Sequence, residues 1–162
     1  MWEDQCFLIG SQELPEEWIG EIRYVLENEL IRQCRIGKNR FYVCPLPGFN
    51  LLAAQAVVRH PGAELYPVCP DRQWATALPE TWKKLLCNAD GTVYLSDYAP
   101  SFLEDEVFEW SACLHFLVHH AKVCIYYLGQ PDVFAEYIIR GALVHRRDIV
   151  DLNIRAGFAH PV

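Results

Sequence analysis

Hydrophobic positions follow two alternating patterns along the chain. Short hydrophobic runs are rich in β-branched and aromatic residues, which is typical of buried strands. Longer stretches between them carry hydrophobic residues three or four positions apart, the spacing of an amphipathic helix. Gly, Pro, Asn and Asp stand at most of the junctions, where they mark turns. The short runs predict strands over residues 5–9, 40–44, 63–69, 92–95, 123–128 and 148–152.

The boundaries of the helices between these strands are also marked in the sequence. Proline is tolerated in the first turn of a helix and glycine commonly ends one, so Pro15 and Gly37 bound the first helix. Asn50 and Asp132 are expected to cap the helices that follow them. The predicted helices run from residue 15 to 37, over 51–60, over 71–89 with a break at residue 79, over 102–120, and from 132 to about 145.

Strict alternation of strands and helices predicts the fold class. Parallel strands need crossover connections, and a helix between successive strands supplies them. Proline cannot donate to a ladder, so Pro67 places the third strand near a sheet edge. We expect an α/β protein: a Rossmann-like three-layer sandwich with a mainly parallel sheet of five to six strands, formed by one domain over residues 1–162.

Composition excludes several classes of protein. The chain has 162 residues, of which 52% are hydrophobic and 13% aromatic, enough for a real core. A formal net charge of −7 argues against broad binding to nucleic acid, whose phosphates are also negative. The chain begins with acidic residues where a secreted protein carries basic ones, and no hydrophobic run approaches the ~18–20 residues of a membrane span. We expect a cytoplasmic protein without membrane contact.

In open parallel sheets, ligands bind outside the carboxyl ends of the strands. Gly48 precedes a helix and would let a phosphate approach the backbone, although glycines at strand ends are often only turn residues. Arg72 and Trp74 could clamp a carboxylate or stack on a base; alternatively, Trp74 packs in the core and Arg72 is solvated. The candidate ligand-binding residues on these loops are Gly10, Ser11, Gln12, Gly48, Asn50, Arg72, Gln73, Trp74, Asp97 and Gly129.

Metal, cofactor and catalytic chemistry find little support. His115 and His119 have the i, i+4 spacing of metal ligands, but no H-E-x-x-H accompanies them and we predict no metal. Neither a G-x-G-x-x-G nor a G-x-x-x-x-G-K-[ST] motif occurs, so we predict no cofactor. The seven cysteines are an odd number without C-x-x-C spacing and are interpreted as reduced core residues. Cys44 and Cys69 end strands that face the expected cleft, yet no partner base is evident, so catalytic residues stay unassigned.

One segment resembles a known family. Residues 48–57, Gly-Phe-Asn-Leu-Leu-Ala-Ala-Gln-Ala-Val, are similar to the "G-x-D-x-x-A-A-E-x-V" segment of the YpsA-like SLOG proteins. These small bacterial Rossmann-like proteins are grouped with the cytokinin-activating LOG enzymes and the Smf/DprA domain. A strand that ends at Pro70 and is followed by Gln73, and residues 117–121 before the fifth strand, extend the resemblance to about residues 6–153. The resemblance implies a nucleotide or nucleotide-derived ligand.

The chain departs from that family pattern at several positions. Asn50 and His119 stand where aspartates are common, and Cys113-Leu114 where an Arg-Asn pair is usual. Residues 129–132, Gly-Gln-Pro-Asp, replace a Gly-Gly-Thr loop that is expected to bring backbone N–H groups against phosphate. Proline has no N–H to give and an aspartate repels an anion. The resemblance is therefore to a divergent member whose phosphate loop is altered.

Three functions remain open from the sequence. The leading hypothesis is a bacterial SLOG-like sensor or carrier that binds a nucleotide-like small molecule, and the sequence leaves open whether it catalyses any reaction. The first alternative is a LOG-like nucleoside-monophosphate N-glycosidic hydrolase that would need an acid such as Asp97 or Glu109. The second is a ligand-free interaction module with Trp2, Trp18 and Trp110 at its interface. The aromatic content is also compatible with a homodimer.

Overall fold

The computed structural model describes residues 5–98 and 106–153, with side chains from residue 110 onward in the second range. The strands are β1 (Gln5–Gly10), β2 (Arg40–Val43), β3 (Glu64–Cys69), β4 (Val93–Tyr94), β5 (Val123–Tyr127) and β6 (Asp148–Asp151). The helices are α1 (Ile19–Arg35), α2 (Phe49–Arg59), α3 (Arg72–Thr76), α4 (Glu80–Asn88), α5 (Glu106–His120) and α6 (Val133–Val144). A short 3-10 turn, η2 (Glu16–Trp18), precedes α1, and a second one, η3 (Leu95–Asp97), follows β4.

The strands form one sheet in the order β4-β3-β2-β1-β5-β6. Every strand pair in the described ranges is parallel. In the centre, Leu8 of β1 stands between Val43 of β2 and Ile125 of β5. The predicted α/β fold with a parallel Rossmann-like sheet is confirmed. The strand that contains Pro67 is next to the edge, and the edge itself is the short β4, paired only through Val68 and Cys69.

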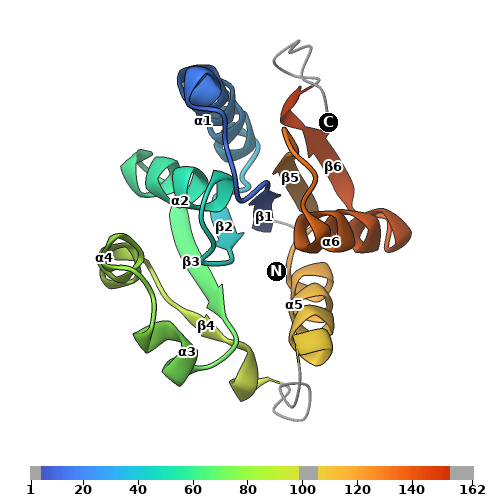
Figure 1. The fold of residues 1–162 in the computed structure, drawn as a ribbon. Coiled ribbons are helices and arrows are strands. Elements are labelled where there is room, and N and C mark those ends of the chain that lie inside the picture. Colours follow the sequence, from blue (N-terminus) through green and yellow to red (C-terminus); the bar gives the residue numbers. More distant parts are fainter. Residues whose placement is uncertain (1–4, 99–105, 154–162) are drawn as a thin grey trace.

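Helices cover both faces of the sheet. Figure 1 shows α1, α2 and α4 on one face and α5 and α6 on the other. Successive residues of β1 alternate between the two cores: Cys6 and Leu8 pack toward the first face, and Phe7 and Ile9 toward the second. Because both faces are covered, the strand is buried at every position, and its residues Cys6–Ile9 are hydrophobic without alternation with polar residues. In the described ranges, none of the helices has the length and hydrophobicity to cross a bilayer.

Most helix boundaries match the sequence pattern, with one clear exception. Asp132 caps α6 as predicted, since its side chain accepts a hydrogen bond from the N–H of Ala135. The expected break at Pro79 separates α3 from α4. The prediction that Asn50 caps its helix is wrong: α2 begins at Phe49, one residue earlier, and Asn50 is fully buried inside it. The predicted start of the long helix at residues 102–105 lies outside the described residues.

Candidate functional site

A cleft of about 210 Å³ lies at the carboxyl ends of the strands, next to the core covered by α5 and α6. The loops after β1, β2 and β3, the turn η3, and the helices α3, α5 and α6 all contribute to its lining. We call it the aromatic cleft. The described lining residues are Gln12, Cys44, Leu46, Val68, Pro70, Trp74, Leu95, Trp110, Cys113 and Phe134.

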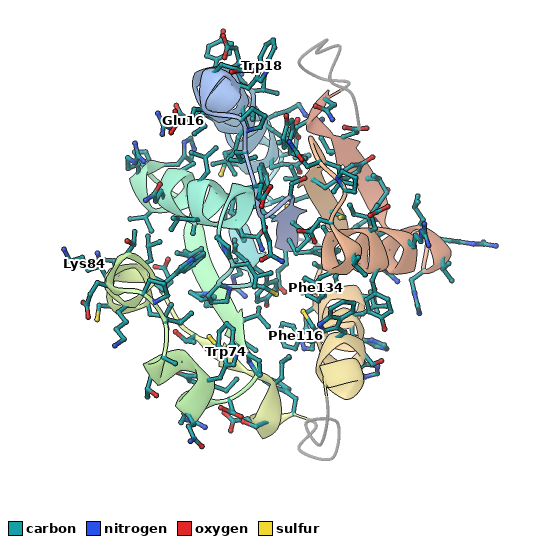
Figure 2. All side chains as sticks on the ribbon, viewed as in Figure 1. Glu16, Trp18, Trp74, Lys84, Phe116 and Phe134 are labelled. Carbon is teal, nitrogen blue, oxygen red and sulfur yellow. The ribbon has the colours of Figure 1, made fainter. Side chains whose placement is uncertain are left out.

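Aromatic rings stand on two sides of this cleft. Trp74 comes from α3 on one side, and Phe134 from α6 lies on the other; both are labelled in Figure 2. Trp110 of α5 packs beside Phe134, with 5.2 Å between ring centroids and 59° between the ring planes. Flat π surfaces on opposing walls suit a planar aromatic ligand, because base–aromatic stacking does not depend on a particular base.

The described part of the lining contains no Asp, Glu, His, Lys or Arg. Its polar groups are the amide of Gln12, the thiols of Cys44 and Cys113, and the indole N–H groups of Trp74 and Trp110. An amide offers both donors and an acceptor, which is what recognition of a base edge requires. The cleft can therefore select a ligand by shape, stacking and hydrogen bonding, while the described lining supplies no carboxylate or imidazole for acid–base catalysis.

Beside the cleft, the loops that follow β1 and β5 meet where the strand order reverses, the usual position for a phosphate. Here the hydroxyl oxygen of Ser11 accepts hydrogen bonds from the N–H groups of Gly129 at 3.1 Å and Gln130 at 3.2 Å. The same hydroxyl donates to the carbonyl of Gln130 at 2.8 Å. Two N–H groups that a phosphate could use are therefore bonded to the chain itself.

The carboxylate of Asp132 lies at the same junction of the two loops and bonds two further N–H groups. One carboxylate oxygen accepts from the N–H of Ala135 at 2.9 Å, and the other from the N–H of Gln12 at 3.1 Å. A negative charge is thus fixed at the positive end of α6, where it complements the helix dipole. A bound anion would face this carboxylate and would find the N–H groups of Ala135 and Gln12 already bonded to it.

Two of the candidate glycines are required by close packing of the chain. A Cβ atom on Gly48 would lie 2.4 Å from the backbone of Gln12, and φ at Gly48 is +77°. A Cβ atom on Gly10 would lie 2.5 Å from the carbonyl oxygen of Tyr127 and 2.6 Å from the ring of Phe49. The space beside Gly48 that we expected to admit a phosphate is filled by the loop after β1.

Asn50 links the ends of two strands from inside α2. Its Oδ1 atom accepts a hydrogen bond from the N–H of Gly10, and its Nδ2 atom donates to the carbonyl of Cys44, both at 3.0 Å. No solvent reaches the side chain. Asn50 therefore positions the backbone of the cleft, and an amide is suited to this because one bond needs an acceptor and the other a donor.

Arg72 and Asp97 bind each other at the surface. Two guanidinium nitrogens donate to the two carboxylate oxygens at 2.9 and 3.0 Å, and the guanidinium carbon lies 4.4 Å from the centre of the Tyr94 ring. The hydrogen bonds from Arg72 lower the pKa of the Asp97 carboxyl. A ligand anion would have to displace Asp97 to receive both hydrogen bonds. Gln73 is exposed on α3 and is not among the lining residues.

His115 and His119 lie beside each other on α5. Their ring centroids are 4.2 Å apart, and Nδ1 of His119 hydrogen-bonds to the backbone carbonyl of His115. In the part of the chain that the structure describes, no three His, Cys, Asp or Glu residues are grouped so that they could hold a metal ion.

The structure therefore sorts the predicted residues into three sets. Gln12 and Trp74 line the aromatic cleft; Gly10, Ser11, Gly48, Asn50 and Gly129 build the loops around it; Arg72, Gln73 and Asp97 lie outside the lining. The loop rule missed Trp110, Cys113 and Phe134, because they come from helices. Their only signal in the sequence was residue type: aromatic rings and a thiol on the last two helices.

A comparison of the sequence with protein-family models and with curated proteins finds no match.

Proposed function

We propose that this protein binds a planar, base-like small molecule, such as the base or nucleoside part of a nucleotide-derived ligand, in the aromatic cleft. The observation that carries the proposal is that Trp74 lies on one side of the cleft, with Trp110 and Phe134 on the other. The described lining residues are all uncharged. Stacking on such rings contributes about 1–3 kcal/mol per base.

The size of the cleft favours a small ligand. Its volume of about 210 Å³ is below the range of about 300–1,000 Å³ that is typical of sites for drug-sized ligands. A base or nucleoside suits this volume better than a dinucleotide does. We expect the amide of Gln12 to select among bases, since it is the one described lining side chain with strong donors and an acceptor together.

Phosphate contributes little to binding in this proposal. Ser11 and Asp132 already bond the N–H groups at the reversal of the strand order. Any phosphate on the ligand would extend into solvent near the mouth of the cleft. We therefore expect the nucleoside and its monophosphate to bind with similar affinity, in contrast to proteins that hold phosphate at a helix N-terminus.

Membership of the SLOG group and a cytoplasmic location belong to the same proposal. The resemblance of residues 48–57 supports the first, although Asn50 and Asp132 mark the chain as divergent. The second is supported by seven cysteines that are all free, as expected in a reducing compartment. A sensor or carrier fits better than a hydrolase, because Asp97 is bound to Arg72 outside the lining. The side chain of Glu109, the other candidate acid, lies outside the described residues.

Calorimetry and thermal-shift measurements with bases, nucleosides, nucleoside monophosphates and nucleotide sugars test the proposal. We expect at least one base or nucleoside to bind, and Trp74→Ala to weaken binding by about 5–150-fold, the equivalent of losing one stacked ring. Tyr24→Ala is the control, since Tyr24 is 68% exposed on α1 and away from the cleft. The absence of binding across the whole panel, or equal affinity in Trp74→Ala and the wild type, would refute the proposal.

A further inference from the structure

Two thiols in the lining of the aromatic cleft are in direct contact. The Sγ atoms of Cys44 and Cys113 lie 3.3 Å apart and are buried, although the residues are 69 positions apart in sequence. Cys44 directly follows β2 and Cys113 lies on α5, so the contact joins the sheet to the helix layer that covers it. The S–S bond of a disulfide is about 2.05 Å long. The two Sγ atoms would therefore have to approach by about 1.3 Å when oxidation joins them.

This pair differs from the other cysteines of the chain. Cys6 and Cys69 belong to the core on the opposite face of the sheet, and Cys87 is exposed on α4. Only Cys44 and Cys113 among the cysteines line the cleft. A small oxidant that enters the cleft therefore meets two thiols already side by side, within a lining whose described residues contain no other nucleophile.

We propose that Cys44 and Cys113 are a redox modification site, at which a two-electron oxidant of the peroxide class forms a disulfide between the end of β2 and α5. In the first step, one sulfur attacks a peroxide oxygen, the O–O bond breaks, and a sulfenic acid and water form. In the second step, the other sulfur attacks the sulfenic sulfur and a second water leaves. Two thiols and one hydrogen peroxide thus give one disulfide and two waters. The two sulfurs together lose two electrons, and the peroxide gains them.

The surroundings of Cys44 indicate a slow reaction at neutral pH. Its hydrogen bond with Cys113 and its burial raise the pKa of the Cys44 thiol well above the usual value. Among the described residues, Cys113 from α5 is the titratable group that acts on Cys44, and Cys44 in turn helps to raise the pKa of the Cys69 thiol on β3. All three thiols are buried. Because the thiolate is the attacking species, disulfide formation should speed up as the pH rises. The site is therefore suited to sustained oxidation rather than to rapid peroxide turnover.

The experiment uses the full chain with Cys87→Ser, which removes the exposed thiol and its intermolecular side reactions. The reduced protein is incubated with hydrogen peroxide at pH 7 and at pH 9, digested without reductant and mapped by mass spectrometry. We expect a linked peptide containing Cys44 and Cys113, about 2 Da lighter than the sum of the two thiol peptides, that forms faster at pH 9. We also expect the melting temperature to rise by at least about 5 °C and to return after reduction, because the bond closes a long loop.

Two variants provide the controls. Cys113→Ser, or Cys44→Ala if the first folds poorly, should abolish both the linked peptide and the thermal shift, whereas Cys34→Ser should retain them. A mapped bond between any other pair, or recovery of Cys44 and Cys113 as free thiols or sulfinic acids at pH 9, would overturn the proposal. These readouts use no ligand, so they are independent of the outcome of the binding panel.

Discussion

The side chain of Asn50 hydrogen-bonds to the backbone N–H of Gly10 across a sequence separation of 40 residues, at 3.0 Å. The bond joins the first helix turn after β2 to the last residue of β1. A second bond from the same amide, to the carbonyl of Cys44, fixes the end of β2. Neighbouring strand ends are thus held at a fixed spacing beneath the aromatic cleft by one buried side chain.

Replacing Asn50 tests this relationship. Asn50→Ala leaves the N–H of Gly10 and the carbonyl of Cys44 without their partner in a buried setting, so we expect the free energy of unfolding to fall by about 2–4 kcal/mol. Urea unfolding followed by circular dichroism measures the loss. Gln55→Ala, a partly exposed change on the same helix, should cost no more than about 0.5 kcal/mol. Equal losses in the two variants would mean that the Asn50 bonds contribute little.

The conformation of Gly48 gives a second prediction. An alanine there would combine a φ of +77° with a Cβ atom 2.4 Å from the Gln12 backbone, so Gly48→Ala should lower the free energy of unfolding by at least about 3 kcal/mol. Gly20→Ala is a matched control, since nothing lies within 4 Å of its Cβ position. That change in α1 should be neutral or stabilising by up to about 1 kcal/mol. A small loss of stability in Gly48→Ala would show that the loop after β2 can move away from the loop after β1 at little cost.

The fold could be predicted from the sequence because the central strands β1, β2 and β5 are mostly buried and the strands are bounded by turn residues. The break at Pro79 and the cap at Asp132 depend on local chemistry alone, and both were predictable. Asn50 was misassigned for a related reason. In the sequence, a polar residue two positions after Gly48 looks like a helix cap. Its actual partner, the N–H of Gly10, lies at the end of β1 and is distant in the sequence.

The candidate site was only partly predictable. The loop rule finds residues that directly follow strands, and it located Gln12 and Trp74 at the cleft. Trp110 and Phe134 reach the cleft only because α5 and α6 pack together with a particular rotation about their axes. Helical periodicity shows that such residues lie on a buried side but does not show which neighbour they meet. The contact of Cys44 with Cys113 likewise requires tertiary structure.

The pair formed by Tyr126 and Asp151 predicts behaviour at alkaline pH. The hydroxyl of Tyr126 donates to Asp151 at 3.0 Å, and burial together with this bond raises the pKa of Tyr126 to about 12. Since the folded value exceeds the unfolded value of about 10, this group contributes stability that is fully present below pH 10. The contribution is lost as the pH rises through about 12.

Absorbance titration of tyrosinate and unfolding curves from pH 9 to pH 12 measure this contribution. Tyr126→Phe should remove one late-titrating tyrosine, and its stability should decline less steeply above pH 10 than that of the wild type. Tyr24→Phe, at a position 68% exposed, is the control and should leave the decline in stability unchanged. If the two variants gave superimposable titrations, the hydrogen bond to Asp151 would not raise the pKa of Tyr126.

The carboxylate of Asp132 gives the last prediction, which concerns anion binding. In the wild type it bonds the N–H groups of Ala135 and Gln12 and keeps a negative charge at the start of α6. Asp132→Ala should lower the free energy of unfolding by about 1–2 kcal/mol through loss of the cap. It should also leave two N–H groups and the positive end of the helix dipole open to an anion. Millimolar phosphate should then raise the melting temperature of the variant more than that of the wild type, at constant ionic strength.

Asp71→Ala is the control. It removes the cap of α3, where the side chain accepts a hydrogen bond from the N–H of Trp74, and it should lower stability without adding a phosphate response. An equal phosphate response in the wild type and Asp132→Ala would mean that the internal carboxylate does not stand in for an anion, and that the loop after β5 can still receive one.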